Sequence, residues 1–169
     1  MSKRTRQYLG ILAALGAYYL LHEGAHLLYA LVTGVFKQIR FMGLGVQIDI
    51  CAQDMTDMQL AIFCLTGPLA TLLAGYLLTL FTKKICRWKN ALLRAAAYYV
   101  TIAFLLTDPL YLSVLCGFFG GGDMNGIALL CPEWAARCFF GALLLANGLV
   151  FRKQILPAYQ LAFQNSPTQ

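Results

Sequence analysis

The sequence predicts an all-α, multi-pass integral membrane protein with four transmembrane helices, or five, and a short membrane-associated β-hairpin after the first helix. Three observations predict this fold class. Of the 169 residues 60% are hydrophobic and only 12% are charged, long apolar runs recur, and one connection alternates apolar with polar residues. Soluble domains carry about 25% charged residues, so this chain has too few to cover a water-exposed surface. Its length suits a single domain.

Four helices are expected because about 20 apolar residues cross a bilayer. They span residues 8–32, 60–81, 91–119 and 127–151. The third passes through Asp108-Pro109, and the count becomes five if residues 110–119 form a broken helix of their own. A single domain over residues 1–152 holds these elements, and residues 153–169 form a short C-terminal tail.

Residues 36–51 connect the first two helices and predict a β-hairpin. Val46, Ile48 and Ile50 alternate with polar residues, which is typical of a strand. Gly43 and Gly45 can supply the turn between two such strands. An amphipathic surface hairpin with no role in recognition is the alternative interpretation.

Basic residues gather where the predicted helices leave the bilayer. Ten of the 13 lie on one side of a four-helix arrangement, namely Lys3, Arg4, Arg6, Lys83, Lys84, Arg87, Lys89, Arg94, Arg152 and Lys153. Such clustering is typical of cytoplasmic loops, so it places both ends of this chain in the cytoplasm. It also makes nucleic acid a poor explanation for the net charge of +6. The lipid bilayer is the expected partner.

His22, Glu23 and His26 form the pattern His-Glu-x-x-His inside the first apolar run. Residues i and i+4 share one face of a helix, so both imidazoles can reach one metal ion. Glu23 then lies beside them, placed to act on a water. Charged groups at bilayer depth cost about 2.5–3.5 kcal/mol each and are usually functional. The alternative is two neutral histidines hydrogen-bonded to Glu23 inside a helix bundle, but the pattern favours a metal site.

A catalytic zinc site usually has three protein ligands, and the chain contains no third histidine. The third ligand is therefore expected to be a carboxylate or a cysteine. Asp123 is favoured because it follows three glycines, and irregular backbone at membrane depth is tolerated where it lines a cavity. Its alternative role is the N-cap of the helix that begins near Ile127. Asp108, directly before Pro109, favours a loop or kink residue instead.

The second predicted helix carries a small residue at every fourth position: Gly67, Thr71 and Gly75. Such a stripe lets another helix approach closely, and Pro68 can kink the helix at this point. Either ordinary helix packing explains the stripe, or the stripe holds the metal-binding helix in register.

Together these residues resemble the site-2 protease family of intramembrane zinc metalloproteases. Four features match in order over residues 9–130: HEGAH in a membrane helix, the hairpin FMGLGVQIDI, GPLAT in the next helix, and an aspartate near glycines. The resemblance implies one Zn²⁺ per chain, bound by His22, His26 and Asp123, with Glu23 as the catalytic base.

The resemblance also assigns roles around the metal. In that family the hairpin is thought to present an edge strand to the unwound substrate, which implicates the hairpin residues Gly43, Leu44, Gly45, Val46, Gln47 and Ile48. The implied supporting positions are Gly67, Pro68, Thr71 and Asn125.

Two motifs depart from the family pattern. Gly-Pro-x-x-Asn reads GPLAT over residues 67–71, which reduces the amide to a hydroxyl, and Asp-Gly reads DMNG over residues 123–126. The membrane orientation stays open as well. The charge pattern puts His22 about 20 Å along a helix that enters from the cytoplasm, whereas the family places its zinc nearer the cytosolic face.

The expected function is hydrolysis of a peptide bond in or near a transmembrane segment of a membrane-protein substrate. Zinc lowers the pKa of a bound water, and Glu23 accepts its proton and passes it to the leaving amine. The alternative is a catalytically inactive, protease-like protein that binds or holds membrane partners. With no attached soluble domain, substrate selection is expected from the membrane core or from a separate regulatory membrane partner. The expected location is the bacterial cytoplasmic membrane.

Overall fold

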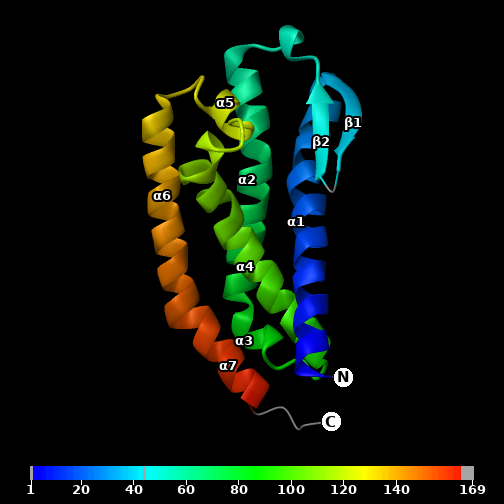
Figure 1. Ribbon diagram of the computed structural model, residues 1–169, viewed down its shortest axis with the longest axis vertical. Coiled ribbons are helices and arrows are strands. Elements are labelled where there is room, and N and C mark those ends of the chain that lie inside the picture. The colour runs from blue at the N-terminus through cyan, green and yellow to red at the C-terminus, as the bar shows by residue number, and fades with distance from the viewer. Residues whose placement is uncertain (1, 44, 165–169) are drawn as a thin grey trace.

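The computed structural model describes residues 2–43 and 45–164. Long helices lie side by side along one axis, and a short hairpin stands against the first of them (Figure 1). The helices and strands are α1 (Lys3–Thr33), β1 (Phe36–Met42), β2 (Gly45–Ile50), α2 (Asp57–Leu80), α3 (Thr82–Ile85), α4 (Ala91–Ser113), α5 (Asp123–Ile127), α6 (Glu133–Val150) and α7 (Leu156–Gln164).

The first two long helices begin at residues that cap their free N–H groups. The Ser2 hydroxyl accepts a hydrogen bond from Thr5 N at 3.1 Å. At the start of α2 the Thr56 hydroxyl accepts from Gln59 N, and the Gln59 side chain accepts from Thr56 N at 2.9 Å, which is the reciprocal capping box. These caps explain why both helices start before the apolar runs that predict them.

The predicted hairpin over residues 36–51 is confirmed. Strands β1 and β2 pair antiparallel from Phe36↔Ile50 to Met42↔Gly45. Gly43 adopts φ +62° in the turn, a conformation that glycine reaches without steric cost. Leu44, also assigned to this turn, lies outside the described residues. The hairpin runs beside the second half of α1 (Figure 1).

Three helical segments among the described residues are long and apolar enough to cross a membrane: Asp57–Leu80, Ala91–Ser113 and Glu133–Gln164. The first expected span, residues 8–32, folds as a single helix, but α1 is not one of the three. Its tyrosines and the His-Glu-His group lower its mean hydropathy. The structure therefore supports a membrane protein with three candidate spans, and it does not establish a count of four or five.

The boundaries of the later helices differ from those expected. Pro109 lies inside α4, which ends at Ser113 rather than at residue 119. The last predicted helix, expected from residue 127, begins only at Glu133 as α6, and the separate short helix α5 ends at Ile127. A π turn over Phe151–Ile155 then joins α6 to α7.

Residues 153–164 of the predicted C-terminal tail are therefore helical, and residues 165–169 lie outside the described part. The start of α1, the end of α7 and the α3–α4 connection lie at one end of the bundle, and α5 lies near the other (Figure 1).

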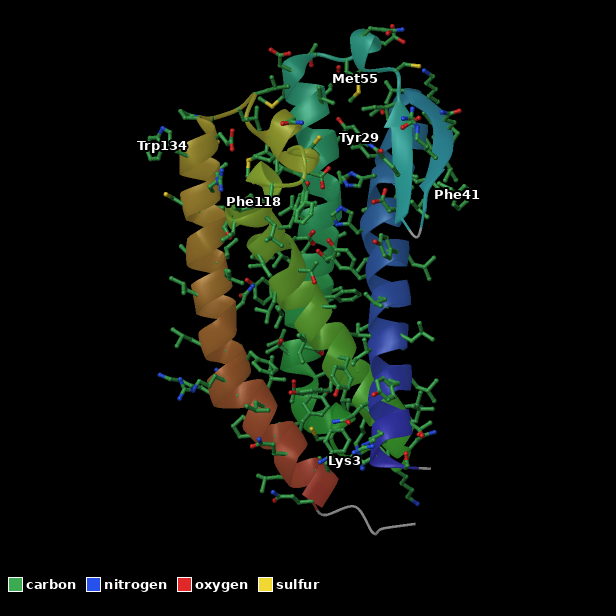
Figure 2. The ribbon with its side chains drawn as sticks, viewed as in Figure 1. Lys3, Tyr29, Phe41, Met55, Phe118 and Trp134 are labelled. Atoms are coloured by element: carbon green, nitrogen blue, oxygen red, sulfur yellow. The ribbon has the colours of Figure 1, made fainter. Side chains whose placement is uncertain are left out.

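Large apolar side chains cover much of the outer surface. Leu20 is 80% exposed, Leu73 64% and Leu145 72%, on three different long helices. At the hairpin Phe41 points away from the bundle, and Trp134 does so at the start of α6 (Figure 2). Exposed apolar area on this scale is unusual for a soluble monomer and fits contact with lipid.

Candidate metal centre

His22 and His26 lie one turn apart on α1 and face the interior of the bundle. Their exposed fractions are only 8% and 3%. The two Nε2 atoms are 3.2 Å apart, so the helix presents both imidazoles to one point, as the i, i+4 spacing predicts.

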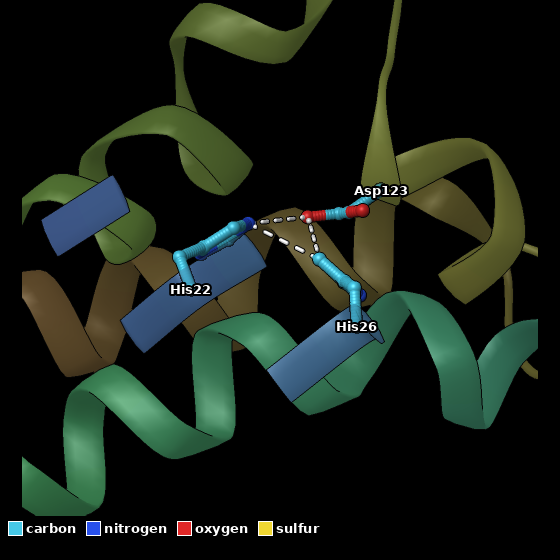
Figure 3. Close-up of side chains that lie close together, drawn as sticks. All are labelled: His22, His26 and Asp123. Atoms are coloured by element: carbon cyan, nitrogen blue, oxygen red, sulfur yellow. Dashed lines mark hydrogen bonds and ion pairs between the residues drawn. The ribbon is translucent and has the colours of Figure 1, made fainter. Parts of the chain in front are cut away.

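Asp123 is the first residue of α5 and completes this group (Figure 3). Its Oδ2 atom lies 3.2 Å from His22 Nε2 and 3.5 Å from His26 Nε2. Zinc–ligand bonds of about 2.0–2.1 Å in a tetrahedron put neighbouring ligand atoms about 3.3 Å apart. The three measured separations match that value, so His22, His26 and Asp123 form one face of a tetrahedral site and can hold a metal ion.

The local backbone explains how Asp123 reaches the histidines. Gly120, Gly121 and Gly122 have φ angles of +84°, +85° and +47°, a run that residues with a Cβ rarely adopt. This turn lies between the end of α4 at Ser113 and the start of α5, and it directs Asp123 toward α1. The residue before α5 is Gly122, and no side chain caps the helix. The N-cap interpretation of Asp123 is therefore wrong.

At Gly67, the backbone of α2 approaches the imidazole rings of both histidines closely. A Cβ atom built on Gly67 would lie 2.5 Å from His26 Nε2 and 2.8 Å from His22 Nε2, closer than real Cβ contacts. One member of the small-residue stripe thus faces the two histidines directly. Gly75 instead packs on Phe104 and Leu105 of α4.

The His26 ring is held by α2. Its Nδ1 lies 2.8 Å from the Phe63 carbonyl oxygen and 3.1 Å from the Thr66 hydroxyl. If Nδ1 donates its N–H to that carbonyl oxygen, the Nε2 lone pair is free to bind a metal. A metal-binding histidine usually donates its other ring N–H in this way.

Asp108 supports His22 from the other side, a role that the sequence did not predict. It is not a loop residue: it lies inside α4 and is 1% exposed. Its Oδ1 is 3.2 Å from His22 Nδ1, a close contact that lacks the alignment of a full hydrogen bond. Tyr18 donates to the same oxygen at 2.5 Å, and the Thr71 hydroxyl donates to Oδ2. An ionisable residue in a predicted membrane helix was the signal for this role.

Replacement of Asp108 by Asn should weaken zinc binding by about ten- to a hundredfold, because partners of metal-binding histidines contribute to affinity on that scale. The Kd for zinc, measured by competition with a chelating dye, checks this. Asp54→Asn removes an exposed carboxylate outside the site and should leave the Kd unchanged. Equal Kd values for Asp108→Asn and wild type would contradict the role given to Asp108.

The charge of the group also favours a cation. The carboxylates of Glu23, Asp108 and Asp123 surround the two histidines. Within residues 2–43 and 45–164, no lysine or arginine forms an ion pair with any of them. Buried negative charge is costly without a compensating partner, and a divalent ion supplies one.

Glu23 stands between the histidines and the hairpin. Its carboxylate is close to His22, His26 and Asp123, and to the backbone N–H of Ile48 on β2. A cavity of about 260 Å³ lies along the hairpin, lined by Lys37 and Arg40 of β1, Gln47 to Ile50 of β2 and Phe63 of α2. The hairpin therefore borders the group.

The other sequence-predicted positions fall into two sets. Gly43 and Gln47 are exposed on the hairpin, Gly45 and Val46 are half-buried, and Ile48 is buried. Around the histidines, Pro68 and Thr71 are buried in α2, and Thr71 reaches the group through Asp108.

Asn125 supports the backbone before Asp123 and is not one of the three candidate metal ligands. Its Nδ2 donates to the Gly120 carbonyl oxygen at 3.2 Å. It therefore stabilises the glycine turn that precedes Asp123 rather than contacting the histidines.

Comparison of the chain with models of known protein families, with curated proteins and with solved structures gave no significant match.

Proposed function

We propose that this chain is an intramembrane zinc metalloprotease of the site-2 protease type, which hydrolyses a peptide bond in or near a transmembrane segment of a membrane-protein substrate. One observation carries the proposal. His22, His26 and Asp123 meet at tetrahedral spacing, and Glu23 stands beside them.

One Zn²⁺ per chain suits this donor set. Two imidazole nitrogens and one carboxylate oxygen are typical ligands of catalytic zinc, which keeps its fourth position for water or substrate. When bound, zinc supplies Lewis acidity at a carbonyl and lowers the pKa of a water at its open position. His22 and His26 hold their Nε2 atoms toward the ion because Asp108 and the Phe63 carbonyl oxygen fix the opposite sides of the rings.

Glu23 provides the proton transfers that hydrolysis needs. Its carboxylate accepts a proton from the attacking water and delivers it to the nitrogen of the departing amine. Its nearness to His22, His26 and Asp123 suits both transfers. A metal held by those three residues would bring the water and the scissile bond close to this carboxylate.

The hairpin offers a place for an extended substrate. Strand β2 pairs with β1 on one side, and no third strand joins the sheet among the residues described. A transmembrane segment loses its helical hydrogen bonds when it unwinds. A peptide that adds to the free edge of β2 replaces them with hydrogen bonds to the strand. The Ile48 N–H beside Glu23 marks the point where such a peptide meets the site.

We further propose that α1 is a fourth transmembrane helix. Its outer face carries Leu12, Leu20 and Val32, exposed by 65%, 80% and 79%, while His22 and His26 are buried. This arrangement puts the site inside a four-helix membrane core. A bacterial cytoplasmic membrane is the location we propose, with a separate membrane partner as a possible regulator.

The rival function is an inactive protease-like protein that only binds membrane partners. Thr71, in place of the family asparagine, favours it at first sight. The Thr71 hydroxyl nevertheless donates to Asp108, so a polar link to His22 is retained. The intact Glu23 also favours an enzyme, because binding alone needs no general base.

Chelation separates the two functions. Purified protein in detergent is incubated with a panel of transmembrane peptides, then treated with a zinc chelator and reloaded with Zn²⁺. We expect peptide cleavage that stops on chelation and returns on reloading. Peptides that bind but stay intact in zinc-loaded protein would favour the rival.

A further inference from the structure

A second cavity, of about 520 Å³, lies at the end of the bundle where α1 begins and α7 ends. Lys3 and Arg6 of α1 line it, together with Tyr98 and Tyr99 of α4 and Phe163 of α7. Figure 2 shows Lys3 at this end. The cavity is far from α5 and from the metal group, so it has no part in the proposed hydrolysis.

Among the described residues, the charged side chains that line this cavity are all basic. The chain has seven acidic side chains, and all lie elsewhere in the sequence: Glu23, Asp49, Asp54, Asp57, Asp108, Asp123 and Glu133. No Asp or Glu is among the described residues that line the cavity. Ten basic residues lie in the segments that converge at or near this end. A ligand here must therefore be anionic.

Aromatic rings fix the basic groups without neutralising them. The Arg6 guanidinium carbon lies 5.5 Å from the centre of the Phe163 ring, and that of Arg94 lies 5.6 Å from the same ring. Such a contact holds the Arg6 guanidinium in place and leaves its N–H groups able to bind an anion, whereas Arg94 already donates to the Trp88 carbonyl oxygen at 2.6 Å. Gln7 and Gln160 add polar side chains to the wall.

We propose that this cavity binds the phosphate-bearing headgroup of an anionic phospholipid. The phosphate is recognised by Arg6 and Lys3, because guanidinium groups bind phosphate oxygens in pairs. Leu156 and the aromatic rings give the rest of the wall an apolar surface, which suits the glycerol backbone and the first acyl carbons. A free phosphate would leave that apolar surface uncovered.

The position in the chain supports a lipid. Helices α1, α4 and α7 begin or end at this cavity, and Trp88 in the neighbouring connection is 42% exposed. Tyrosine and tryptophan are enriched at the headgroup level of membrane proteins. Clusters of basic residues at such a boundary bind anionic lipids.

The test measures lipids bound to the detergent-purified full chain by native mass spectrometry. Phosphatidylglycerol and phosphatidylcholine of equal acyl length are titrated. We expect phosphatidylglycerol to bind about tenfold more tightly, and the double variant Lys3→Gln/Arg6→Gln to lose that preference. The matched control Arg152→Gln/Lys153→Gln removes the same charge outside the cavity and should retain it.

The remaining outcomes overturn the proposal. Equal losses in the two double variants would mean diffuse attraction to the charged end rather than a site. Displacement of the lipid by equimolar glycerol phosphate would identify a soluble phosphate as the ligand, and displacement by an acidic peptide would identify a protein partner. If Lys3→Gln/Arg6→Gln does not fold, Phe163→Leu, which removes the ring beside Arg6, must reduce the lipid preference instead.

Discussion

Replacement of Glu23 by Gln is expected to lower peptide cleavage by about 10²–10⁴-fold, the usual contribution of a general base, while zinc per chain stays at the wild-type value. Gln keeps the size and polarity of the side chain but cannot accept the proton. His22, His26 and Asp123 remain in place, so the metal should be retained. The measurement is the initial rate of peptide cleavage together with zinc content on the same preparation.

The matched control for this variant is Glu133→Gln. Glu133 is the only other glutamate in the chain. It is exposed and pairs with Arg137 at 3.2 Å on the surface of α6, so its replacement should leave cleavage within about twofold of wild type, as expected for a surface pair. If Glu23→Gln cuts as fast as Glu133→Gln, Glu23 is not the base.

Replacement of Gly67 by Ala is expected to lower zinc affinity at least tenfold. The new Cβ would lie 2.5 Å from His26 Nε2, about 1 Å inside a normal contact, so the imidazoles must move. Metal sites tolerate shifts of only about 0.2 Å in ligand distance. Overpacking of this kind also destabilises a core by about 1–3 kcal/mol. Zinc competition and thermal unfolding measure the two effects.

Gly16→Ala is the control for this change. Gly16 lies on α1, and nothing lies within 4 Å of a Cβ built there. Because Ala favours helix over Gly by about 1 kcal/mol, this variant should bind zinc normally and be at least as stable as wild type. Full zinc affinity in Gly67→Ala would show that α2 does not pack against the metal group in the way described.

Much of the candidate site could be predicted because it depends on local chemistry. His22 and His26 share a helix face by spacing alone, and Gly43 sits at the turn of an alternating segment. Asp123 was favoured because three glycines precede it, and those glycines do adopt the left-handed backbone that turns α5 toward α1. The structure brings the three together, and their binding of zinc stays a prediction.

The remainder depends on tertiary contacts that a single sequence does not display. The helix through Pro109 was expected, but Asp108 was interpreted as a loop or kink residue, and its burial against His22 was not foreseen. The helix over residues 153–164 was missed because apolar runs indicate where a helix can lie and not where it ends. Hydropathy does not identify α1 as a span, because the same residues that form the site make the helix more polar.

Zinc content is the measurement that tests the central claim most directly. Wild type, Glu23→Gln, His26→Ala and Asp123→Ala are purified in detergent, and zinc per chain is determined by elemental analysis. We predict one zinc for wild type and for Glu23→Gln, and loss of the metal from the other two. A wild-type protein that purifies without metal and cannot be loaded with zinc would contradict the account and require a structural explanation for His22, Glu23 and His26.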